Sequence, residues 1–436
     1  MIHYITSTGV GNAWVGNELM ALAKQDIPFV LHSLHRPKST FFKSDEVAAI
    51  NADTHIIYPQ SAWAVFCAVC SGPFLFGGSF WFALLNSFFG RKESFVVRLK
   101  SILHFAVACH WAKSLMGSDV SHIHSQWINS CGTVGMYGAW LLNKPFSFTG
   151  HAADLFRERC ALKDKIARAK FIVCISSFHR DFYLSEGAEL SQLVIVYCGI
   201  DTSLFKPVTR PVAQAGQPIR IISSARLVEK KGLCYLIDAC SLLNANNMSF
   251  TCTIGGDGPL LDELQRQVNH AGLAEKVFFT GQPLLQEDIP GFMETGDIYC
   301  LPCVWASDGD VDGLPQMLME AMACGIPVIS TDLVGMPDLI KQGHSGLLVE
   351  SENPRALAEA IRRLAEDQTL RETLAMEGRE KVIRTFDISV CLQPLLSKFK
   401  QALSSTIEDI NNKTSSEASS ETVNETTNET TKQGQL

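Results

Sequence analysis

The stretch from Trp305 to Glu350 reads WASDGDVDGLPQMLMEAMACGIPVISTDLVGMPDLIKQGHSGLLVE. Its middle predicts a helix, because Pro315 suits a first helical turn, where its missing N–H group costs nothing, and Gly325 suits a helix end. The predicted helix runs from Leu314 to Cys324. Two apolar runs follow it, PVIST and GLLVE, and each predicts a buried strand. The stretch is therefore typical of an α/β fold.

The predicted helix has one apolar face, which leaves Gln316 and Glu320 on another face. The apolar positions recur at helical spacing: Leu314, Met317, Leu318, Ala321 and Met322. Packing of that face would hold Glu320 in place, while the free N–H groups and the dipole of the first turn favour an anion. Such an arrangement suits a nucleotide sugar, with the ribose at the carboxylate and the phosphate at the N–H groups.

The string D-G-L-P-x-x-x-x-E-A-M-A-x-G-x-P-V, which begins at Asp312, resembles the E-x7-E region of retaining glycosyltransferases of family 4, two-domain enzymes of the GT-B fold. The resemblance implies that Glu320 contacts the ribose hydroxyls. It also implies that Asp312 contacts the donor sugar together with the backbone that follows it: Gly313, Leu314 and Pro315. The family usually has glutamate at the position of Asp312, so the reach here is shorter by one methylene. Either carboxylate alone would indicate only an acidic loop or a surface residue, but the whole string favours the site.

The length of 436 residues exceeds what one hydrophobic core usually serves, so two domains are expected. The composition, 46% hydrophobic and 19% charged, is that of a globular protein. The net charge of -8 argues against a general nucleic-acid binder, and no nucleic-acid partner is expected. The 14 cysteines are scattered and no cleavable signal peptide precedes the first strand, which together predict a cytoplasmic location.

Apolar runs alternate with helical patterns along the chain, which predicts two Rossmann-like domains with parallel sheets. The predicted strands are IHYIT, PFVLHS, HIIYP, VSHIHS, FSFT, FIVCIS and LVIVY in the first half, and IRIIS, FTCTI, VFFT, DIYCLP, PVIST and GLLVE in the second. The resemblance implies that the two sheets face a central cleft. We place an acceptor-binding domain at residues 1–205 and a nucleotide-sugar domain at 206–387, with the joint in the glycine- and proline-rich segment 198–218. By resemblance a helix at 388–403 crosses back to the first domain, and the polar tail 404–436 is expected to be disordered.

Residues 61–116 depart from this pattern with a long apolar run that is interrupted at Gly72–Pro73 and at Gly77–Gly78. The pieces are shorter than the roughly 20 residues that a membrane-spanning helix needs. Cations then alternate with aromatic residues in RKESFVVRLKSILHFAVACHWAK. Two interpretations stay open: helices that contact an anionic membrane surface, peripherally on the inner face of the plasma membrane, or helices whose apolar faces form the core of the first domain.

Arg226 and Lys231 lie in SSARLVEKKG, between a predicted strand and a predicted helix. A diphosphate leaving group needs fixed positive charge, and the two side chains can reach the same phosphates from a strand end and a loop. They match the Arg and the Lys of the family pattern R-x4-K-G, so the resemblance assigns both to the diphosphate. The neighbouring Lys230 is interpreted as an ordinary surface residue.

Glycines in three further loops are candidate donor-binding positions: Gly256 and Gly258 in GGDGP, Gly281 in FTGQ, and Gly11 in TSTGVGNAWVGNE. Such loops let the backbone approach a nucleotide closely, although a plain tight turn explains the first of them nearly as well. By resemblance Gly281 lies near the base and Gly11 near a phosphate or the acceptor. The first loop of the chain lacks the third glycine of a dinucleotide fingerprint, so an NAD site is not expected.

His151 follows a predicted strand in FSFTGHAADLF. A histidine there can donate a hydrogen bond to a sugar hydroxyl or a phosphate, and T-x-H-x-x-D resembles the family position that does so. Asp154 would orient His151 or contact the acceptor. His122 and His124 lie in one predicted strand with no third ligand nearby, so no metal site is expected.

These features predict a retaining glycosyltransferase that moves a sugar from a nucleoside diphosphate sugar to a hydroxyl of a carbohydrate or polyprenyl-linked acceptor. Arg226 and Lys231 would stabilise the departing diphosphate, with Asp312 and His151 beside the sugar. No cofactor or metal is expected, since the resemblance implies that cationic side chains do that work. FSFTGHAADLF and GDVDGLP resemble enzymes of exopolysaccharide or cell-envelope glycan synthesis. The alternatives are a GT-B-fold epimerase or hydrolase, and a non-catalytic nucleotide-sugar-binding protein, the latter motivated by Asp312.

Overall fold

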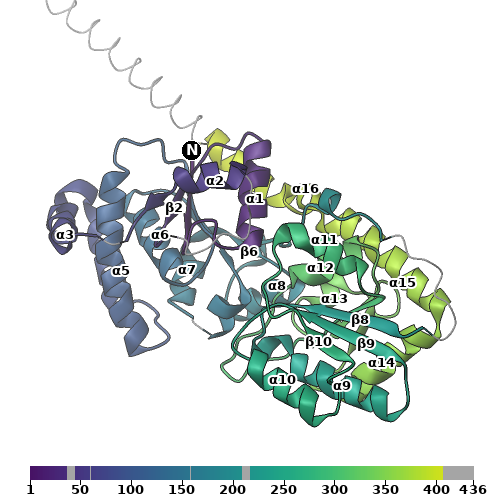
Figure 1. Cartoon of the computed structure of the whole chain (residues 1–436). Coiled ribbons are helices and arrows are strands. Elements are labelled where there is room, and N and C mark those ends of the chain that lie inside the picture. Colours follow the sequence, from purple (N-terminus) through teal and green to yellow (C-terminus); the bar gives the residue numbers. More distant parts are fainter. Residues whose placement is uncertain (37–44, 59, 158, 209–216, 406–436) are drawn as a thin grey trace, which may run out of the picture.

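The computed structural model describes residues 1–36, 45–58, 60–157, 159–208 and 217–405. Strands in these ranges form two separate sheets, each covered by helices (Figure 1). Part of the predicted joint, 209–216, and all but the first two residues of the predicted disordered tail lie outside the described residues. The two sheets confirm the predicted fold class, and each predicted strand corresponds to an observed one.

The first sheet has seven parallel strands in the order β3-β2-β1-β4-β5-β6-β7. Its strands are β1 (Ile2–Thr6), β2 (Phe29–Ser33), β3 (His55–Ile56), β4 (His122–Ser125), β5 (Phe146–Gly150), β6 (Ala169–Cys174) and β7 (Leu193–Ile195). Ile2 of β1 pairs with Phe29 on one side and with His122 on the other. Parallel pairing requires long crossover connections. The helices of this half are α1 (Ala13–Lys24), α2 (Asp45–Ala52), α3 (Ala62–Phe76), α4 (Gly78–Phe89), α5 (Phe95–Ser114), α6 (Ser130–Leu141), the π-helix η1 (Ala153–Arg157), α7 (Leu162–Arg168) and α8 (Ser177–Ser185).

The second sheet has six parallel strands in the order β10-β9-β8-β11-β12-β13. They are β8 (Ile219–Ser224), β9 (Phe250–Gly255), β10 (Val277–Phe279), β11 (Ile298–Leu301), β12 (Val328–Thr331) and β13 (Leu347–Val349). The helices are α9 (Leu233–Ala245), α10 (Leu261–His270), α11 (Ile289–Glu294), α12 (Gln316–Ala323), α13 (Met336–Leu339), α14 (Pro354–Glu366), α15 (Gln368–Lys381) and α16 (Ile388–Cys391). Short helical turns lie at η2 (Leu190–Gln192), η3 (Thr202–Leu204), η4 (Glu229–Lys231), η5 (Gln286–Asp288) and η6 (Val382–Phe386).

The strand order reverses beside β1 in the first sheet and beside β8 in the second. In open α/β sheets a ligand crevice forms outside the carboxyl ends of the strands at such a point. The loops that follow β1 and β4, and those that follow β8, β9 and β11, are therefore the ones that the topology brings to a crevice.

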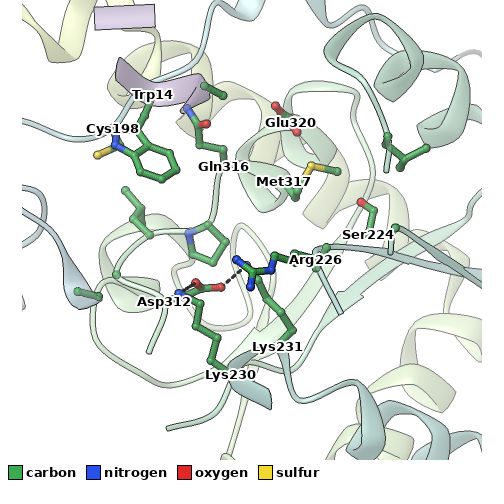
Figure 2. A pocket seen from close by; sticks show the side chains of 18 of the residues that line it. Trp14, Cys198, Ser224, Arg226, Lys230, Lys231, Asp312, Gln316, Met317 and Glu320 are labelled. Carbon is green, nitrogen blue, oxygen red and sulfur yellow. Dashed lines mark hydrogen bonds and ion pairs between the residues drawn. The ribbon is translucent and has the colours of Figure 1, made fainter. Parts of the chain in front are cut away.

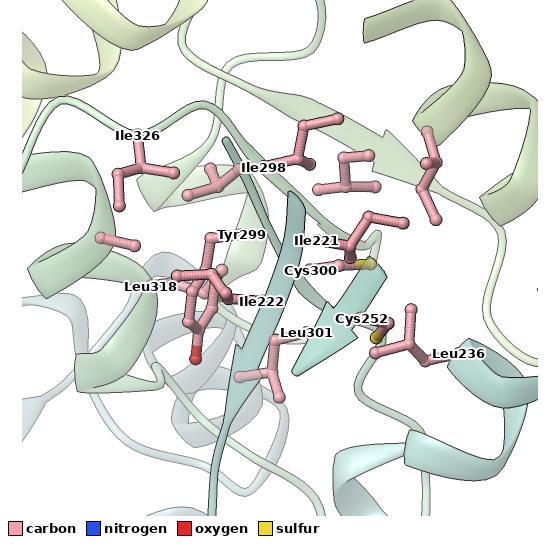
Figure 3. Close-up of a cluster of buried hydrophobic side chains, with 14 of the residues drawn as sticks. Ile221, Ile222, Leu236, Cys252, Ile298, Tyr299, Cys300, Leu301, Leu318 and Ile326 are labelled. Carbon is pink, nitrogen blue, oxygen red and sulfur yellow. The ribbon is translucent and has the colours of Figure 1, made fainter. Parts of the chain in front are cut away.

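The buried core of the second sheet fixes α12. Leu318 of this helix belongs to the cluster that includes Ile222 and Tyr299 (Figure 3). The helix begins at Gln316, two residues later than predicted, and ends one residue earlier. Pro315 has an extended ψ of 122°, and a residue before proline is disfavoured in the helical region, so Leu314 stays outside the helix.

Residues 61–116 fold into α3, α4 and α5. Pro73 lies inside α3, so the apolar run breaks at Gly77, whose φ is 54°, and continues through the predicted break at Gly72–Pro73. Among the described residues one helix, α5, is long and apolar enough to cross a membrane by length and composition alone, and 44% of its apolar window is buried. That inner side packs on α6, where a Cβ at Gly138 would lie 2.5 Å from the Trp111 ring.

The C-terminal segment contacts the first sheet. After α16 and a turn at Leu392, helix resumes over residues 393–405, so the predicted helix at 388–403 is divided in two and reaches the first two residues of the predicted tail. Phe399 packs in a buried cluster with Tyr4 and Phe171, and its ring centroid lies 5.3 Å from that of His124. The yellow end of the chain thus returns to the purple start in Figure 1.

The buried His122 makes stability depend on pH. Its Nε2 lies 2.6 Å from Ser147 Oγ, and burial lowers its pKa from 6.5 to about 3. Below pH 6.5 His122 binds a proton in the unfolded chain but stays neutral in the folded protein. This group therefore lowers the free energy of unfolding as the pH drops from 6.5 toward 3. Between pH 7 and pH 5, His122→Gln should lose roughly 2 kcal/mol less free energy of unfolding than the wild type.

Urea unfolding at the two pH values measures this difference. His344→Gln serves as the control, because His344 is exposed, and it should follow the wild type. Equal losses in all three proteins would contradict the assignment.

Candidate functional site

A cavity of about 790 Å³ lies between the two domains, at the loops that follow the strand ends. Trp14, Trp127 and His151 line it from the first domain. The loops after β8, β9, β10 and β11, together with α12, line it from the second domain (Figure 2). The sheets therefore face a cleft, as predicted, and the strand-order reversals explain its place.

Three cations from the loop after β8 line one wall of the cavity: Arg226, Lys230 and Lys231. Figure 2 shows them gathered beside Asp312. Arg226 is exposed, and its guanidinium makes no hydrogen bond or ion pair with the described residues. Lys230 lies 3.2 Å from both Asp310 and Asp312. The interpretation of Lys230 as ordinary surface was wrong, because the short η4 turn directs it at these carboxylates.

Asp312 forms a buried ion pair with Lys231, and the Cys303 thiol donates to the same carboxylate at 3.5 Å. Burial pushes the pKa of Asp312 up, but Lys231 and Lys230 outweigh burial and hold it below its usual range. Burial likewise pushes the pKa of Lys231 down, and Asp312 outweighs it, so the pKa is raised. Both groups are therefore charged at neutral pH. Any anion that binds here must share these ammonium groups with Asp312.

Glu320 projects from α12 and is 2% exposed. Its Oε1 accepts a hydrogen bond from Gln286 Nε2 at 3.2 Å, while Oε2 has no partner among the described residues. Burial raises the pKa of Glu320 to about 7. A buried acceptor without a donor costs about 1–3 kcal/mol. A ligand that brings hydroxyl donors, as a ribose does, would remove that cost.

Gly313, Leu314 and Pro315 connect Asp312 to α12, and all three line the cavity. A Cβ at Gly313 would lie 2.9 Å from Ile175 Cδ1 of the first domain. Glycine at this position therefore permits the close approach of the two domains at the floor of the site.

Gly256 and Gly258, in the loop after β9, also line the cavity. A Cβ at Gly256, where φ is 126°, would lie 1.9 Å from the carbonyl oxygen of Ala225, and one at Gly258 would lie 2.5 Å from that of Leu227. These glycines thus let their loop pack against the loop that carries Arg226. The close approach that the sequence suggested toward a nucleotide is, in the structure, an approach between two backbone segments.

His151 and two tryptophans form the wall contributed by the first domain. The ring centroid of His151 lies 4.6 Å from that of Trp127 and 5.5 Å from that of Trp14. His151 Nε2 and Trp14 Nε1 are buried and have no hydrogen-bond partner among the described residues. Burial, and then the nearby His179, lowers the pKa of His151 to about 3, so its ring is neutral.

Asp154 positions the loop of His151 rather than the ring. Its Oδ1 accepts from the backbone N–H of His151 at 2.7 Å, and its Oδ2 accepts from that of Ile128 at 2.7 Å. Burial raises the pKa of Asp154 to about 7. It joins the loops after β4 and β5, a role that the spacing T-x-H-x-x-D did not distinguish from contact with an acceptor.

Gly11 and Gly281 are not among the residues that line the cavity. A Cβ at Gly11 would lie 2.7 Å from Thr8 Oγ1, so this glycine serves a tight turn, and in this part of the chain the cavity is lined by Ala13 and Trp14. Gly281 has open space around it, and the later residues 283–286 of its loop line the cavity instead. The residues that line the cavity thus come later in each connection than the two glycines.

Several cavity residues were not predicted, and those with polar or aromatic side chains include Trp14, Trp127, Lys230 and Gln286. Trp14 follows β1 and Trp127 follows β4, and the strand order reverses between these two strands. This reversal is the feature from which both residues could have been predicted. Gln286 reaches Glu320 from a loop whose sequence carries no such signal.

His122 and His124 do not form a metal pair in the structure. Both rings contact the Ser147 hydroxyl, at 2.6 Å and 2.7 Å. Within the described ranges no group of three or more His, Cys, Asp or Glu side chains could hold a metal ion.

Comparison with known proteins identifies the second half of the chain. Residues 208–381 match the family Glycosyl transferases group 1, and this segment is a domain of that family. The amylovoran biosynthesis glycosyltransferase AmsK of Erwinia amylovora is 32% identical over 252 residues, which are 56% of this chain and 61% of that protein. A GDP-mannose-dependent alpha-(1-6)-phosphatidylinositol monomannoside mannosyltransferase of Mycobacterium tuberculosis is 28% identical over 220 residues, 48% of this chain and 56% of that protein. The chain thus matches little more than half the length of these curated relatives.

Solved structures extend the likeness in fold to nearly the whole chain. HepE of Anabaena in complex with UDP superposes with a TM-score of 0.67 and 17% identity, over 94% of this chain and 99% of that one. A glycosyltransferase from Rickettsia africae gives a TM-score of 0.66 and 17% identity, over 92% and 98%. These likenesses confirm the predicted GT-B fold.

Gly256, which lines the cavity, and Gly281, which does not, predict different costs of substitution. Gly256→Ala places a methyl group against the Ala225 carbonyl, whereas Gly281→Ala, also at positive φ, meets nothing within 4 Å. We expect Gly281→Ala to cost about 1 kcal/mol of stability from backbone strain, and Gly256→Ala to cost at least about 2 kcal/mol more. Chemical denaturation of both variants measures this, and equal costs would contradict the close packing of the two loops.

Proposed function

We propose that the protein is a retaining glycosyltransferase that uses a nucleoside diphosphate sugar and transfers the sugar to a hydroxyl of a carbohydrate or lipid-linked acceptor. Its place would be in exopolysaccharide or cell-envelope glycan synthesis, at the cytoplasmic side of the membrane. The family match and the name of AmsK support the reaction class and the polysaccharide product. Structural neighbours in complex with UDP and with UDP-glucose support a nucleotide-sugar donor.

One observation carries the proposal: a cation and a buried acceptor, neither of which has a partner among the described residues, line the same interdomain cavity. The cation is Arg226 and the acceptor is Glu320 Oε2. A nucleoside diphosphate complements both, because its phosphates need positive charge and its ribose hydroxyls donate hydrogen bonds. Lys230 and Lys231 add charge on the phosphate side.

In the proposed reaction the bond between the anomeric carbon and the diphosphate oxygen breaks, and the acceptor oxygen bonds to that carbon on the same face. Negative charge grows on the departing diphosphate, where Arg226 and Lys231 stabilise it. The acceptor proton passes to a leaving phosphate oxygen. The ionised Asp312 lies beside the ammonium groups and offsets positive charge at the sugar. The reaction requires no metal or cofactor in this scheme.

The first domain supplies the acceptor side. The neutral His151 keeps Nε2 free for a hydroxyl of the donor sugar or of the acceptor. Trp14 and Trp127 offer flat apolar surfaces beside it, which suit the apolar faces of sugar rings. This wall supports a carbohydrate group in the acceptor.

Two other activities remain as alternatives on the same fold. An epimerase or hydrolase would consume the donor without transferring the sugar, and a non-catalytic binding protein would take up the donor without consuming it. The engagement of Asp312 by two lysines is the observation that motivates the non-catalytic alternative.

Incubation with UDP, GDP and ADP sugars tests the function. One of them should raise the melting temperature, since a ligand that binds only the folded state stabilises it. Adding glycan or polyprenyl-linked acceptors should then give a product with the donor's anomeric configuration, read by NMR. Arg226→Ala should lower kcat/KM by about 10²–10³-fold with unchanged stability, because Arg226 is exposed.

The matched control is Arg362→Ala, which removes an exposed arginine of α14 that pairs only locally, with Glu359 and Glu366. It should retain full activity. Donor consumption that is independent of any acceptor would favour the hydrolase, and thermal stabilisation without turnover would favour the binding protein.

Donor binding should depend on the ionisation of Glu320. Burial raises its pKa to about 7, and the ionised carboxylate is the better acceptor for ribose hydroxyls, so the affinity falls as pH falls through 7. From pH 8 to pH 6 the Kd should rise about tenfold. Calorimetry with an intact nucleotide sugar, whose phosphates do not titrate in this range, measures it. Glu320→Gln should bind more weakly and independently of pH; a tenfold rise that persists in this variant would refute the role of Glu320.

A further inference from the structure

The helices α3, α4 and α5 present an apolar surface to solvent at the edge of the first domain farthest from the second sheet (Figure 1). Aromatic residues dominate it: Phe74 is 91% exposed, Phe89 80%, Phe95 79% and Trp63 70%. The exposed positions recur every three or four residues along each helix, as Trp81 or Phe82, Leu85 and Phe89 do on α4. Each helix thus has a continuous outer stripe, and we call the three stripes together the aromatic face.

The aromatic face is separate from the core that holds these helices together. On the inner side Phe80 fills the space above Gly72, where a Cβ would lie 2.3 Å from its ring. Phe80 also contacts Phe105, with ring centroids 5.4 Å apart, and Phe105 contacts Tyr137 at 5.7 Å. The inner residues therefore form the hydrophobic core of this part of the first domain. The outer stripes remain without a partner among the described residues.

The charges around the aromatic face are almost all positive. Residues 61–116 contain five lysines and arginines but only one acid, Glu93, in a chain whose net charge is -8. The carboxylate of Glu93 accepts the backbone N–H groups of Ala161 and Leu162 at 2.6 Å and 2.7 Å, at the start of α7. Arg91 and Lys100 are exposed beside the aromatic residues. The surface therefore complements an anionic partner.

A basic cavity lies at the turn between α4 and α5, directly after Phe88 and Phe89. Its volume is about 410 Å³, and four cations outnumber two acids in its lining, which consists of Arg91, Lys92, Glu93, Arg159, Leu162, Lys163 and Glu186. Arg159 and Lys163 share Glu186, and Lys92 pairs with Asp164. The guanidinium of Arg91 has no partner in the described part of the chain, so it can bind a phosphate from outside the protein.

We propose that the aromatic face docks on a bilayer that contains anionic phospholipid. Its phenylalanine and tryptophan rings enter the boundary between headgroups and acyl chains, and Arg91 binds a lipid phosphate. A lipid surface fits better than a protein partner, because the stripes need no hydrogen-bonding complement and Glu93, the one acid within residues 61–116, is engaged by backbone N–H groups at the start of α7. The helices lie on the membrane and do not cross it, since the inner side of α5 is committed to α6.

Docking goes beyond the proposed transfer reaction and can be tested without it. His151 lines the interdomain cavity, and Arg159 and Lys163, which come soon after it in the chain, line the basic cavity. A lipid-linked acceptor in the docked bilayer would thus start close to the site. Should the transfer hypothesis fail, the membrane contact would still stand on the aromatic face.

Co-sedimentation with vesicles of phosphatidylcholine, with and without phosphatidylglycerol, tests the docking. The protein should partition to the anionic vesicles, and Phe82→Glu/Phe89→Glu should lose at least tenfold of that binding. Phe82 and Phe89 are 66% and 80% exposed, so the variant should fold. The control Leu190→Glu/Phe278→Glu, with exposures of 68% and 45% elsewhere on the molecule, should bind as the wild type. Arg91→Glu should remove most of the preference for anionic lipid.

Quenching of tryptophan fluorescence by brominated lipid gives a second measurement. The wild type should be quenched, Trp63→Phe/Trp81→Phe should lose most of the quenching, and Trp305→Phe should keep it. Absence of vesicle binding, equal binding by the two glutamate variants, or lipid-free self-association that Phe82→Glu/Phe89→Glu abolishes would each overturn the proposal. The thermal shift with a nucleotide sugar should be the same in all variants, which separates this result from the outcome for the proposed function.

Discussion

The buried ion pairs of Asp312 with Lys230 and Lys231 join the loops that follow β8 and β11, two neighbouring strands. Removing a charge from water costs several kcal/mol, so each partner needs the other, and the pairs hold both loops in one arrangement. They also keep two ammonium groups at the interdomain cavity in the absence of any ligand. Arg226, beside them, adds a charge that no described carboxylate offsets. The positive wall of the cavity is therefore preorganised, which is what stabilisation of a departing anion requires.

Polar contacts join the two domains, beside an apolar cluster of Ala152, Val311 and Val334. Asp338 accepts the backbone N–H of Ser177 at 2.6 Å, Gln316 donates to the carbonyl of Gly199 at 3.3 Å, and Arg157 lies 3.2 Å from Asp308. Contacts of this kind are typical of interfaces that permit relative domain motion. The apolar return of the C-terminal helix to the first sheet, through Phe399, adds a tether away from the cavity.

The first domain carries two distinct surfaces, the wall of the interdomain cavity and the aromatic face. The ends of β1, β4 and β5 carry the polar and aromatic wall of the cavity, while α3, α4 and α5 carry the aromatic face. Burial gives the cavity its particular chemistry, because it keeps His151 neutral and raises the pKa of Glu320 into the physiological range. Exposure gives the aromatic face a different chemistry, because a large apolar surface in water is stabilised by a partner that covers it and excludes the water.

Local patterns in the chain were enough to find every strand and the class of fold, because the periods of strands and helices are properties of neighbouring residues. Arg226, Asp312 and Glu320 were found through the resemblance of two short strings to a family pattern. The start of α12 at Gln316 instead of Leu314 is a local error of the same kind, and the restriction before proline explains it. Long-range packing decided the rest. Lys230 and Trp14 belong to the cavity, and Gly11 and Gly281 do not, because strand order and the approach of two domains select which loop tips meet. The same packing decided which side of α3, α4 and α5 is core and which side faces water, a choice that composition alone left open.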